Sequence, residues 1–171
     1  MATASIRMVD LLRTTGAAVR GLALPASMDN ALRLTDSIRA GCIYGSISRD
    51  VKLPHVATRD VGAAAANLLL DRSWIGQKDV PVLGPEEHSY TDISRIISEE
   101  TRYRCGYQQV PFDEWKARLV GVGWPEPFAA AYIVMLKAKD EGMDNVAPRS
   151  TAIIGPTSFR QWVREALSSI L

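Results

Sequence analysis

Long apolar runs and an excess of either charge are both missing from this sequence. The longest apolar runs, 62–70 and 128–136, are far too short to cross a bilayer. A formal net charge of +1 gives no electrostatic reason to expect a nucleic-acid or anionic-membrane partner, and no Lys/Arg-rich block occurs. The first residues lack the apolar core of a secretory signal. We therefore expect a cytoplasmic protein that binds neither nucleic acid nor membrane.

Cysteine and histidine are also scarce, with two of each. Cys42 and Cys105 lie far apart in the sequence and form no CxxC motif, which favours reduced thiols over a disulfide framework. His55 and His88 have no neighbours at metal-ligand spacing, so we expect no metal site. Both histidines are expected at the surface or half-buried.

Motifs that bind phosphate or carry nucleophilic catalysis are absent as well. No GxGxxG follows a strand, and no GxxxxGK[ST] occurs. The acidic pairs 86–87 and 99–100 are adjacent, so on a helix their side chains diverge by roughly 100°, and paired-carboxylate chemistry is unsupported. Ser89, Thr157 and Ser158 have no G-x-S-x-G context and are expected to cap helices. Catalytic residues therefore stay unassigned.

The order of the periodic segments predicts an α/β fold. The chain has 171 residues, 47% hydrophobic and 23% charged, which suits one domain with a buried core over residues 1–171. The apolar run 17–24 favours a strand covered on both faces, as in parallel sheets. Further strands are expected at 55–57, 80–83, 103–110 and 151–154, and helices at 6–16, 27–39, 61–70, 89–101, 112–120, 128–141 and 158–167. Residues 41–53 are expected to be irregular, and the C-terminal part mainly helical.

The stretch 55–71 is a strand-to-helix corner around which the other segments are arranged. Thr58 or Asp60 is expected to accept hydrogen bonds from the first helical turn, and Asp60 also suits the positive end of the helix dipole. Gly62 leaves little bulk, so another backbone is expected to come close there. Five side chains have the spacing of a buried helical face: Val61, Ala64, Ala65, Leu68 and Leu69.

Several aromatic residues allow two interpretations. Large aromatics are typical of a core or an interface, and they also line pockets for flat substrates. The residues with this ambiguity are Trp74, Trp115, Trp124 and Trp162, together with Tyr132 and Met135 in an apolar helix.

Four segments resemble landmarks of the NmrA-like family. Leu24–Asn30 is similar to its R-P-x-F-F-M-x-N stretch, with Leu24 in place of the arginine and Ala26 and Ser27 in place of the aromatics. The segment 55–66 resembles its V-A-T-x-D-I-A/G-x-x-A motif. Residues 82–89 and 155–159 resemble later landmarks in the same order.

The resemblance implies an atypical short-chain dehydrogenase with a Rossmann fold that binds NAD(P). It covers only the family's C-terminal, substrate-side half, and implies a partial Rossmann-like sheet with a helical substrate-side C-terminal region. The glycine-rich half and the region of a Tyr-x-x-x-Lys pair are not in this chain. By resemblance, Pro25, Met28 and Asn30 would border the nicotinamide end of a pocket. The alternative is that Pro25 ends a strand and that Ser27, Asp29 or Asn30 caps a helix.

Two hypotheses of function remain open. One is NAD(P)H-linked reduction of a small carbonyl or quinone, or dinucleotide and redox sensing, in a protein whose other half binds most of the cofactor. On this view the chain alone binds NAD(P) weakly or not at all. The other is a non-catalytic interaction module that self-associates or pairs with a separate nucleotide-binding half, because the strand at 17–24 would lie near a sheet edge. A truncated reading frame is a third interpretation.

Overall fold

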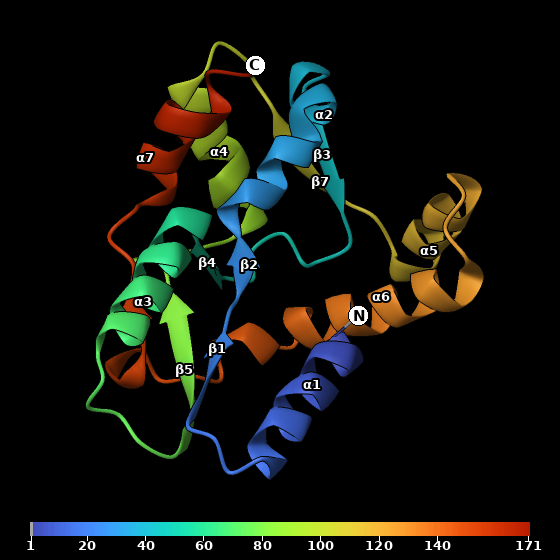
Figure 1. Ribbon diagram of the computed structural model, residues 1–171. Coiled ribbons are helices and arrows are strands. Elements are labelled where there is room, and N and C mark those ends of the chain that lie inside the picture. The colour runs from blue at the N-terminus through green and yellow to red at the C-terminus, as the bar shows by residue number, and fades with distance from the viewer. Residues whose placement is uncertain (1) are drawn as a thin grey trace.

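Helices and mostly parallel strands alternate along the chain in the computed structural model, which describes residues 2–171 (Figure 1). The strands are β1 (Val19–Ala23), β2 (Ala26–Ser27), β3 (Cys42–Gly45), β4 (Leu53–Val56), β5 (Gln77–Leu83), β6 (Glu87–His88), β7 (Gly106–Gln109) and β8 (Ile153–Ile154). The α-helices are α1 (Ala2–Thr14), α2 (Thr35–Arg39), α3 (Thr58–Leu70), α4 (Tyr90–Glu100), α5 (Phe112–Gly121), α6 (Glu126–Asp140) and α7 (Phe159–Trp162). Short 3-10 helices are η1 (Met28–Leu34), η2 (Met143–Asn145) and η3 (Arg149–Thr151), and η4 (Val163–Leu167) is a π-helical turn.

The strands form three small sheets in which almost every pairing is parallel. One has the order β1-β5-β8, with Val19 opposite Gln77 and Val82 opposite Ile153. The second has the order β2-β4-β6, where only β4 and β6 are antiparallel. The third pairs β3 with β7 in parallel. The predicted α/β class is confirmed. In residues 2–171 no helix has the length and apolarity needed to cross a membrane.

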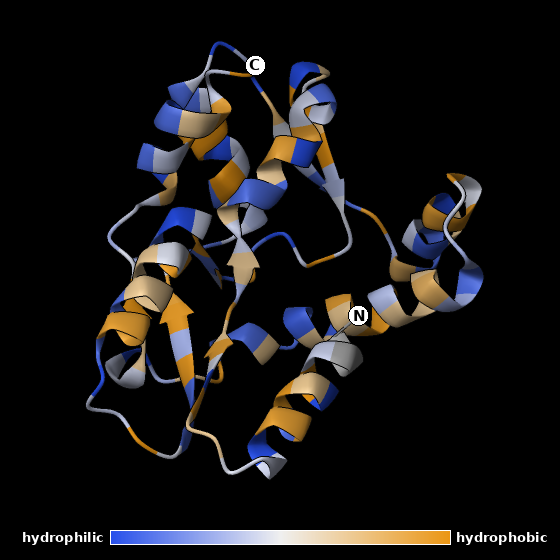
Figure 2. Cartoon of the chain, viewed as in Figure 1, coloured by the Kyte–Doolittle hydropathy of each residue, from blue (hydrophilic) through white to orange (hydrophobic). Residues whose placement is uncertain are grey.

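Buried apolar side chains form the core where α2, α4 and α7 cover β3 and β4. Hydropathy alternates along these helices, whereas β5 is hydrophobic towards its C-terminal end (Figure 2). Ile93, Ile96 and Ile97 of α4 are buried as their spacing predicts. The main cluster also contains Met28, Ala31, Ile38, Ile43, Ala57, Phe159, Trp162, Val163 and Leu167.

Strand β3 was not expected, because residues 41–53 were predicted to be irregular. Gly41 has a left-handed φ of 86° and makes the turn from α2 into the strand. At Gly45 a Cβ would lie 2.8 Å from the hydroxyl oxygen of Tyr107 on β7. The two glycines therefore allow a short strand to form and to pack against an aromatic ring. A strand this short has no hydrophobic periodicity by which the sequence could predict it.

The expectation that the strand at 17–24 is covered on both faces is wrong. Val19 to Leu22 are only half-buried and Ala23 is exposed. Among the described strands, β1 pairs only with β5. An edge strand keeps one flank in solvent, and apolar composition alone does not distinguish it from a central one.

The corner at the start of α3 differs from its prediction in three ways. Residue Ala57 precedes the helix, and neither Thr58 nor Asp60 caps it with its side chain. Instead Asp29 Oδ2 accepts hydrogen bonds from the Thr58 backbone N–H at 3.1 Å and from the Thr58 hydroxyl at 2.5 Å. Nothing lies within 4 Å of a Cβ built at Gly62, and Leu69 is 80% exposed. The cap is thus supplied by a distant carboxylate.

Asp60 and Thr157 form a buried pair, although both were expected to cap helices. The Asp60 carboxylate accepts a hydrogen bond from the Thr157 N–H at 3.0 Å and one from its hydroxyl at 2.8 Å. At Gly155 a Cβ would lie 2.4 Å from Asp60 Oδ2, so the chain passes close to this carboxylate. The pair links α3 to the segment before α7. Ser158 does cap α7, since its side chain accepts a hydrogen bond from the Gln161 N–H at 3.1 Å.

Candidate functional site

A cavity of about 560 Å³ lies where β2, β3 and β7 meet η1, α4, α5 and α6. Its size is typical of small-molecule sites, and its wall is largely apolar and aromatic. Two cations and no acidic residue belong to the wall. The lining residues are Pro25, Ala26, Ser27, Asn30, Arg33, Leu34, Ile43, Tyr44, Gly45, Ser46, Ile47, Tyr90, Tyr107, Trp115, Tyr132, Met135, Leu136 and Lys139.

The predicted nicotinamide contacts occupy different positions. Pro25 and Asn30 line the large cavity. Met28 is only 2% exposed and lines a smaller adjoining cavity of about 70 Å³, together with His55 and other residues. The capping alternative is confirmed for Ser27, whose side chain accepts a hydrogen bond from the Asp29 N–H at 3.2 Å. The structure thus brings Pro25 and Asn30 together and places Met28 behind the wall.

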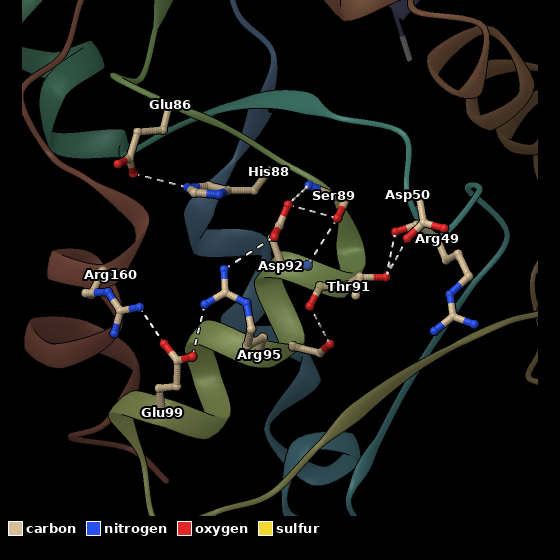
Figure 3. Close-up of polar contacts among 11 residues, drawn as sticks. Arg49, Asp50, Glu86, His88, Ser89, Thr91, Asp92, Arg95, Glu99 and Arg160 are labelled. Carbon is tan, nitrogen blue, oxygen red and sulfur yellow. Dashed lines mark hydrogen bonds and ion pairs between the residues drawn. The ribbon is translucent and has the colours of Figure 1, made fainter.

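Tyr90 is the residue that both cavities share at the start of α4. The capping box predicted at Ser89 and Asp92 is present, and the Ser89 side chain accepts a hydrogen bond from the Asp92 N–H at 3.1 Å (Figure 3). The Thr91 hydroxyl lies 3.0 Å from the Arg49 carbonyl oxygen, to which it donates a hydrogen bond (Figure 3). These contacts hold the first turn of α4 against the loop after β3. The position of Tyr90 is therefore fixed by its sequence neighbours.

Stacking and burial set the chemistry of the Tyr90 side chain. Its ring stacks on Tyr107, with centroids 4.8 Å apart and an interplanar angle of 20°. The Tyr107 hydroxyl donates a hydrogen bond to the Ile47 carbonyl oxygen at 2.7 Å. Burial raises the pKa of Tyr90 to about 12 and raises that of Tyr107 as well. Both phenols are neutral at pH 7, and the Tyr90 hydroxyl is available as a hydrogen-bond donor, whereas that of Tyr107 already donates to Ile47.

Among the four tryptophans, the pocket interpretation holds for Trp115 alone. Trp162 is buried in the core and stacks on Phe159, with centroids 5.8 Å apart. Trp124 packs edge-on against Tyr132 at 5.3 Å, and Trp74 lies under the Arg20 guanidinium at 4.3 Å. Tyr132 and Met135, which shared the ambiguity, do line the cavity. A wall built from six chain segments has no single motif, so sequence reasoning missed Tyr90, Tyr107 and Arg33.

His55 is buried, contrary to expectation, whereas His88 is half-buried. His55 is 5% exposed, and its Nδ1–H donates to the Leu53 carbonyl oxygen at 2.9 Å. Burial lowers the pKa of His55 to about 4, so the ring is neutral at pH 7. His55 is buried because it belongs to β4, in which every residue is buried. Cys42 and Cys105 are free thiols. No cluster of three or more potential metal ligands occurs in the part of the chain that the structure describes.

Solved structures share the fold of this chain. The NADPH complex of the NADPH-dependent quinone oxidoreductase from Escherichia coli matches with a TM-score of 0.76 and 17% identity, over 95% of this chain and 58% of that one. Citrobacter sp. triphenylmethane reductase complexed with NADP(H) matches with a TM-score of 0.68 and 20% identity, over 86% of this chain and 52% of that one. A nucleoside-diphosphate-sugar epimerase from Staphylococcus aureus matches with a TM-score of 0.73 and 14% identity, over 91% of this chain and 55% of that one. The chain has the fold of one part of these proteins.

The sequence comparisons agree with this result but are less specific. The prestalk A differentiation protein A of Dictyostelium discoideum is 24% identical over 118 residues, which are 67% of this chain and 38% of that protein. No family model matches the chain. The expected resemblance to NmrA-like, NAD(P)-binding proteins is confirmed at the level of the fold. The chain spans little more than half of the solved structures and less than half of the curated relative.

The described residues fit a flat ring better than a dinucleotide diphosphate. A diphosphate needs open backbone N–H groups at a glycine-rich turn. The tightest glycines are instead packed against protein, since a Cβ at Gly84 would lie 2.0 Å from the His55 carbonyl oxygen and one at Gly155 would meet Asp60. Neither position leaves space for a phosphate, and neither glycine lines the large cavity, whose wall is largely apolar and aromatic.

Proposed function

We propose that the chain supplies the substrate side of an NAD(P)H-linked reductase of small carbonyl compounds or quinones, or of a dinucleotide sensor built the same way. The observation that supports this most is the cavity of about 560 Å³ with five aromatic side chains in its wall. Of the proteins that share the fold, one is named for a quinone and one for a triphenylmethane, and both compounds contain unsaturated six-membered rings. A cavity of this composition suits the same class.

The residues of this chain bind and orient the substrate in the proposed reaction. Reducing a carbonyl takes a hydride, which NAD(P)H supplies when bound, and a proton. Pro25 and Asn30 border the nicotinamide end, and Met28 supports that wall from behind. The stacked pair Tyr90 and Tyr107 presents a flat aromatic surface, and the apolar lining excludes water.

The proposal places the diphosphate contacts outside this chain, so the chain alone is expected to bind the cofactor weakly. Isothermal titration of the isolated chain with NADPH and with NADH measures this directly. Weak or undetectable binding is expected with both, because no open glycine-rich cradle occurs in residues 2–171. Low-micromolar affinity for either dinucleotide contradicts this assignment of roles.

Binding of a flat aromatic ketone tests the substrate side. The probe is 2-(hydroxymethyl)anthraquinone, which is neutral, and the signal is quenching of tryptophan fluorescence. We expect saturable quenching that depends on Trp115, so Trp115→Phe loses most of the signal while Trp74→Phe retains it. Trp74 is the matched control because it is half-buried and lies outside the cavity wall. Quenching that does not saturate, or that is equal in both variants, contradicts the proposal.

A second candidate is a non-catalytic interaction module, which the surface of α1 favours. Ile6 is 60% exposed and Leu11 is 68% exposed on this helix, and β1 beside it has an unpaired edge among the described strands. A groove of about 290 Å³ runs between α1 and β1. Exposed apolar surface next to a free strand edge is typical of an association site.

The proposed site of action is the cytoplasm. Free thiols at Cys42 and Cys105 suit a reducing compartment. The proposed partners are a small-molecule substrate and a nucleotide-binding half or a second copy of the chain.

A further inference from the structure

Two tyrosine hydroxyls in the large cavity stay without a hydrogen-bond partner in the described structure. Tyr90 comes from the start of α4, and Tyr132 comes from the middle of α6. Tyr107, by contrast, already donates to the Ile47 carbonyl oxygen. Both tyrosines border the same cavity, so each hydroxyl is free to donate to an acceptor atom bound there.

Tyr90 and Tyr132 belong to the same cavity wall. Burial is the main cause of the raised pKa of Tyr90, and repulsion from an ionised Tyr132 adds to it. Burial also raises the pKa of Tyr132. Both phenols therefore keep their protons at pH 7, and each has one O–H to donate to an acceptor in the cavity. Ser46, whose buried Oγ has no partner in residues 2–171, belongs to the same wall.

A cation borders this pair of hydroxyls. Arg33 lines the cavity, is exposed, and makes no ion pair with any described residue. Its positive charge partly offsets the rise in the pKa of Tyr132, and both residues line the same cavity. The other cation in the wall, Lys139, is already paired with Asp144. The wall thus has one unpaired positive charge and no acidic side chain.

We infer that the cavity selects flat aromatic carbonyl compounds that carry a negatively charged substituent. The Tyr90 and Tyr132 hydroxyls donate hydrogen bonds to the carbonyl oxygen, and the Arg33 guanidinium binds the anionic group. This inference rests on the proposed function, because it names the substrate class of the same cavity. The aromatic wall binds the ring of the substrate, whereas these three side chains select substrates whose rings carry a carbonyl oxygen and an anionic group.

The test compares two anthraquinones that differ in charge. Anthraquinone-2-sulfonate carries the anion, and 2-(hydroxymethyl)anthraquinone is its neutral counterpart. Affinities are measured by isothermal titration for the wild-type chain and for Arg33→Gln, Tyr90→Phe and Tyr132→Phe. Arg72→Gln is the matched control, since Arg72 is also exposed and does not line the cavity. Circular dichroism checks that each variant is folded.

The expected results separate charge from hydrogen bonding. The wild-type chain binds the sulfonate about threefold to fivefold more tightly than the neutral compound at low salt, and added salt reduces the difference. Arg33→Gln removes that preference without weakening the neutral compound, and Arg72→Gln changes neither affinity. Tyr90→Phe and Tyr132→Phe each weaken both compounds about fivefold, as expected for loss of one hydrogen bond.

Three outcomes overturn the inference, and one of them also overturns the proposed function. Equal wild-type affinity for the two compounds, or an equal effect of Arg33→Gln on both, refutes anion selection. Unchanged affinities in both tyrosine variants refute the carbonyl contacts. In either case binding of the neutral compound still supports an aromatic substrate cavity. If the folded wild-type chain binds neither compound, the proposed function fails together with the inference.

Discussion

The Asp60 carboxylate joins two segments that are far apart in the sequence. Its two hydrogen bonds to Thr157 tie the first turn of α3 to the segment that leads into α7. Arg59 adds a third contact, donating from its Nε to the Thr157 hydroxyl oxygen at 3.0 Å. A buried carboxylate with two donors is worth more than an exposed helix cap, because its partners lose water when the chain folds.

Removing this carboxylate is expected to destabilise the fold strongly. In Asp60→Ala the buried N–H and hydroxyl of Thr157 lose their acceptor, which costs about 2–3 kcal/mol in the free energy of unfolding. Urea denaturation followed by circular dichroism measures the change. Asp36→Ala is the control, because the Asp36 side chain is 99% exposed and its loss is expected to cost under about 0.5 kcal/mol. Equal effects of the two substitutions contradict the structural role of Asp60.

His55 is expected to make stability depend on pH. In the folded chain burial lowers its pKa from 6.5 to about 4, whereas the unfolded chain keeps the ordinary value. Between these values the unfolded state binds the extra proton, so stability falls as the pH drops from about 6.5 towards 4. From pH 7 to pH 4.5 the loss from this residue is about 2–3 kcal/mol.

The variant His55→Gln isolates this effect. Glutamine does not titrate, so the variant is expected to be less stable than the wild type at pH 7 but to lose less stability down to pH 4.5. Urea midpoints at half-unit pH intervals measure both slopes. Parallel slopes for the wild type and the variant argue against a neutral, buried His55.

At the scale of elements, two glycines have opposite roles. Gly62 lies within α3 with nothing within 4 Å of an added Cβ, whereas Gly84 follows β5 where a Cβ would lie 2.0 Å from the His55 carbonyl oxygen. Glycine in a helix interior costs backbone entropy, while glycine at a close backbone contact is required by the packing.

Paired alanine substitutions test this difference. Gly62→Ala is expected to raise the free energy of unfolding by about 0.5–1 kcal/mol, because alanine favours the helix and meets no neighbour. Gly84→Ala is expected to lower it by roughly 1–3 kcal/mol, because β4 and the end of β5 must separate. Thermal melts of both variants show the two signs. A stabilised Gly84→Ala variant is incompatible with the close contact.

How far the sequence predicts each element depends on where the partners lie. The cap of α4 was predictable because Ser89 and Asp92 are three residues apart, and so was the buried face of Ile93, Ile96 and Ile97. The role of Asp60 was not, because Thr157 is 97 residues away. The same holds for the cavity, where Pro25 and Asn30 meet side chains from β7, α5 and α6. Local periodicity has no information on such distant contacts.

At the scale of the whole molecule, α1 and β1 form the least covered side. Helix α1 lies beside β1 (Figure 1), and the Arg13 guanidinium binds the Asp79 carboxylate of β5 at 2.5 Å. Ile6, Met8 and Leu11 nevertheless remain exposed on the helix. Since β1 also has a free edge among the described strands, this side combines unpaired backbone groups with apolar side chains. Either a second copy of the chain or a nucleotide-binding half would cover both.

Charge placed on this side is therefore expected to change the oligomeric state. We expect the wild-type chain to self-associate in a concentration-dependent way, as measured by size-exclusion chromatography with light scattering. The double variant Ile6→Glu with Leu11→Glu is expected to be a monomer, because carboxylates would be buried in the interface. Leu69→Glu is the control, since Leu69 is 80% exposed on α3 and its change leaves the mass unaltered. If the wild-type chain is a monomer at all concentrations and unfolds cooperatively, α1 and β1 are stable without a partner. That result removes the support for an interaction module and leaves the cavity as the functional feature.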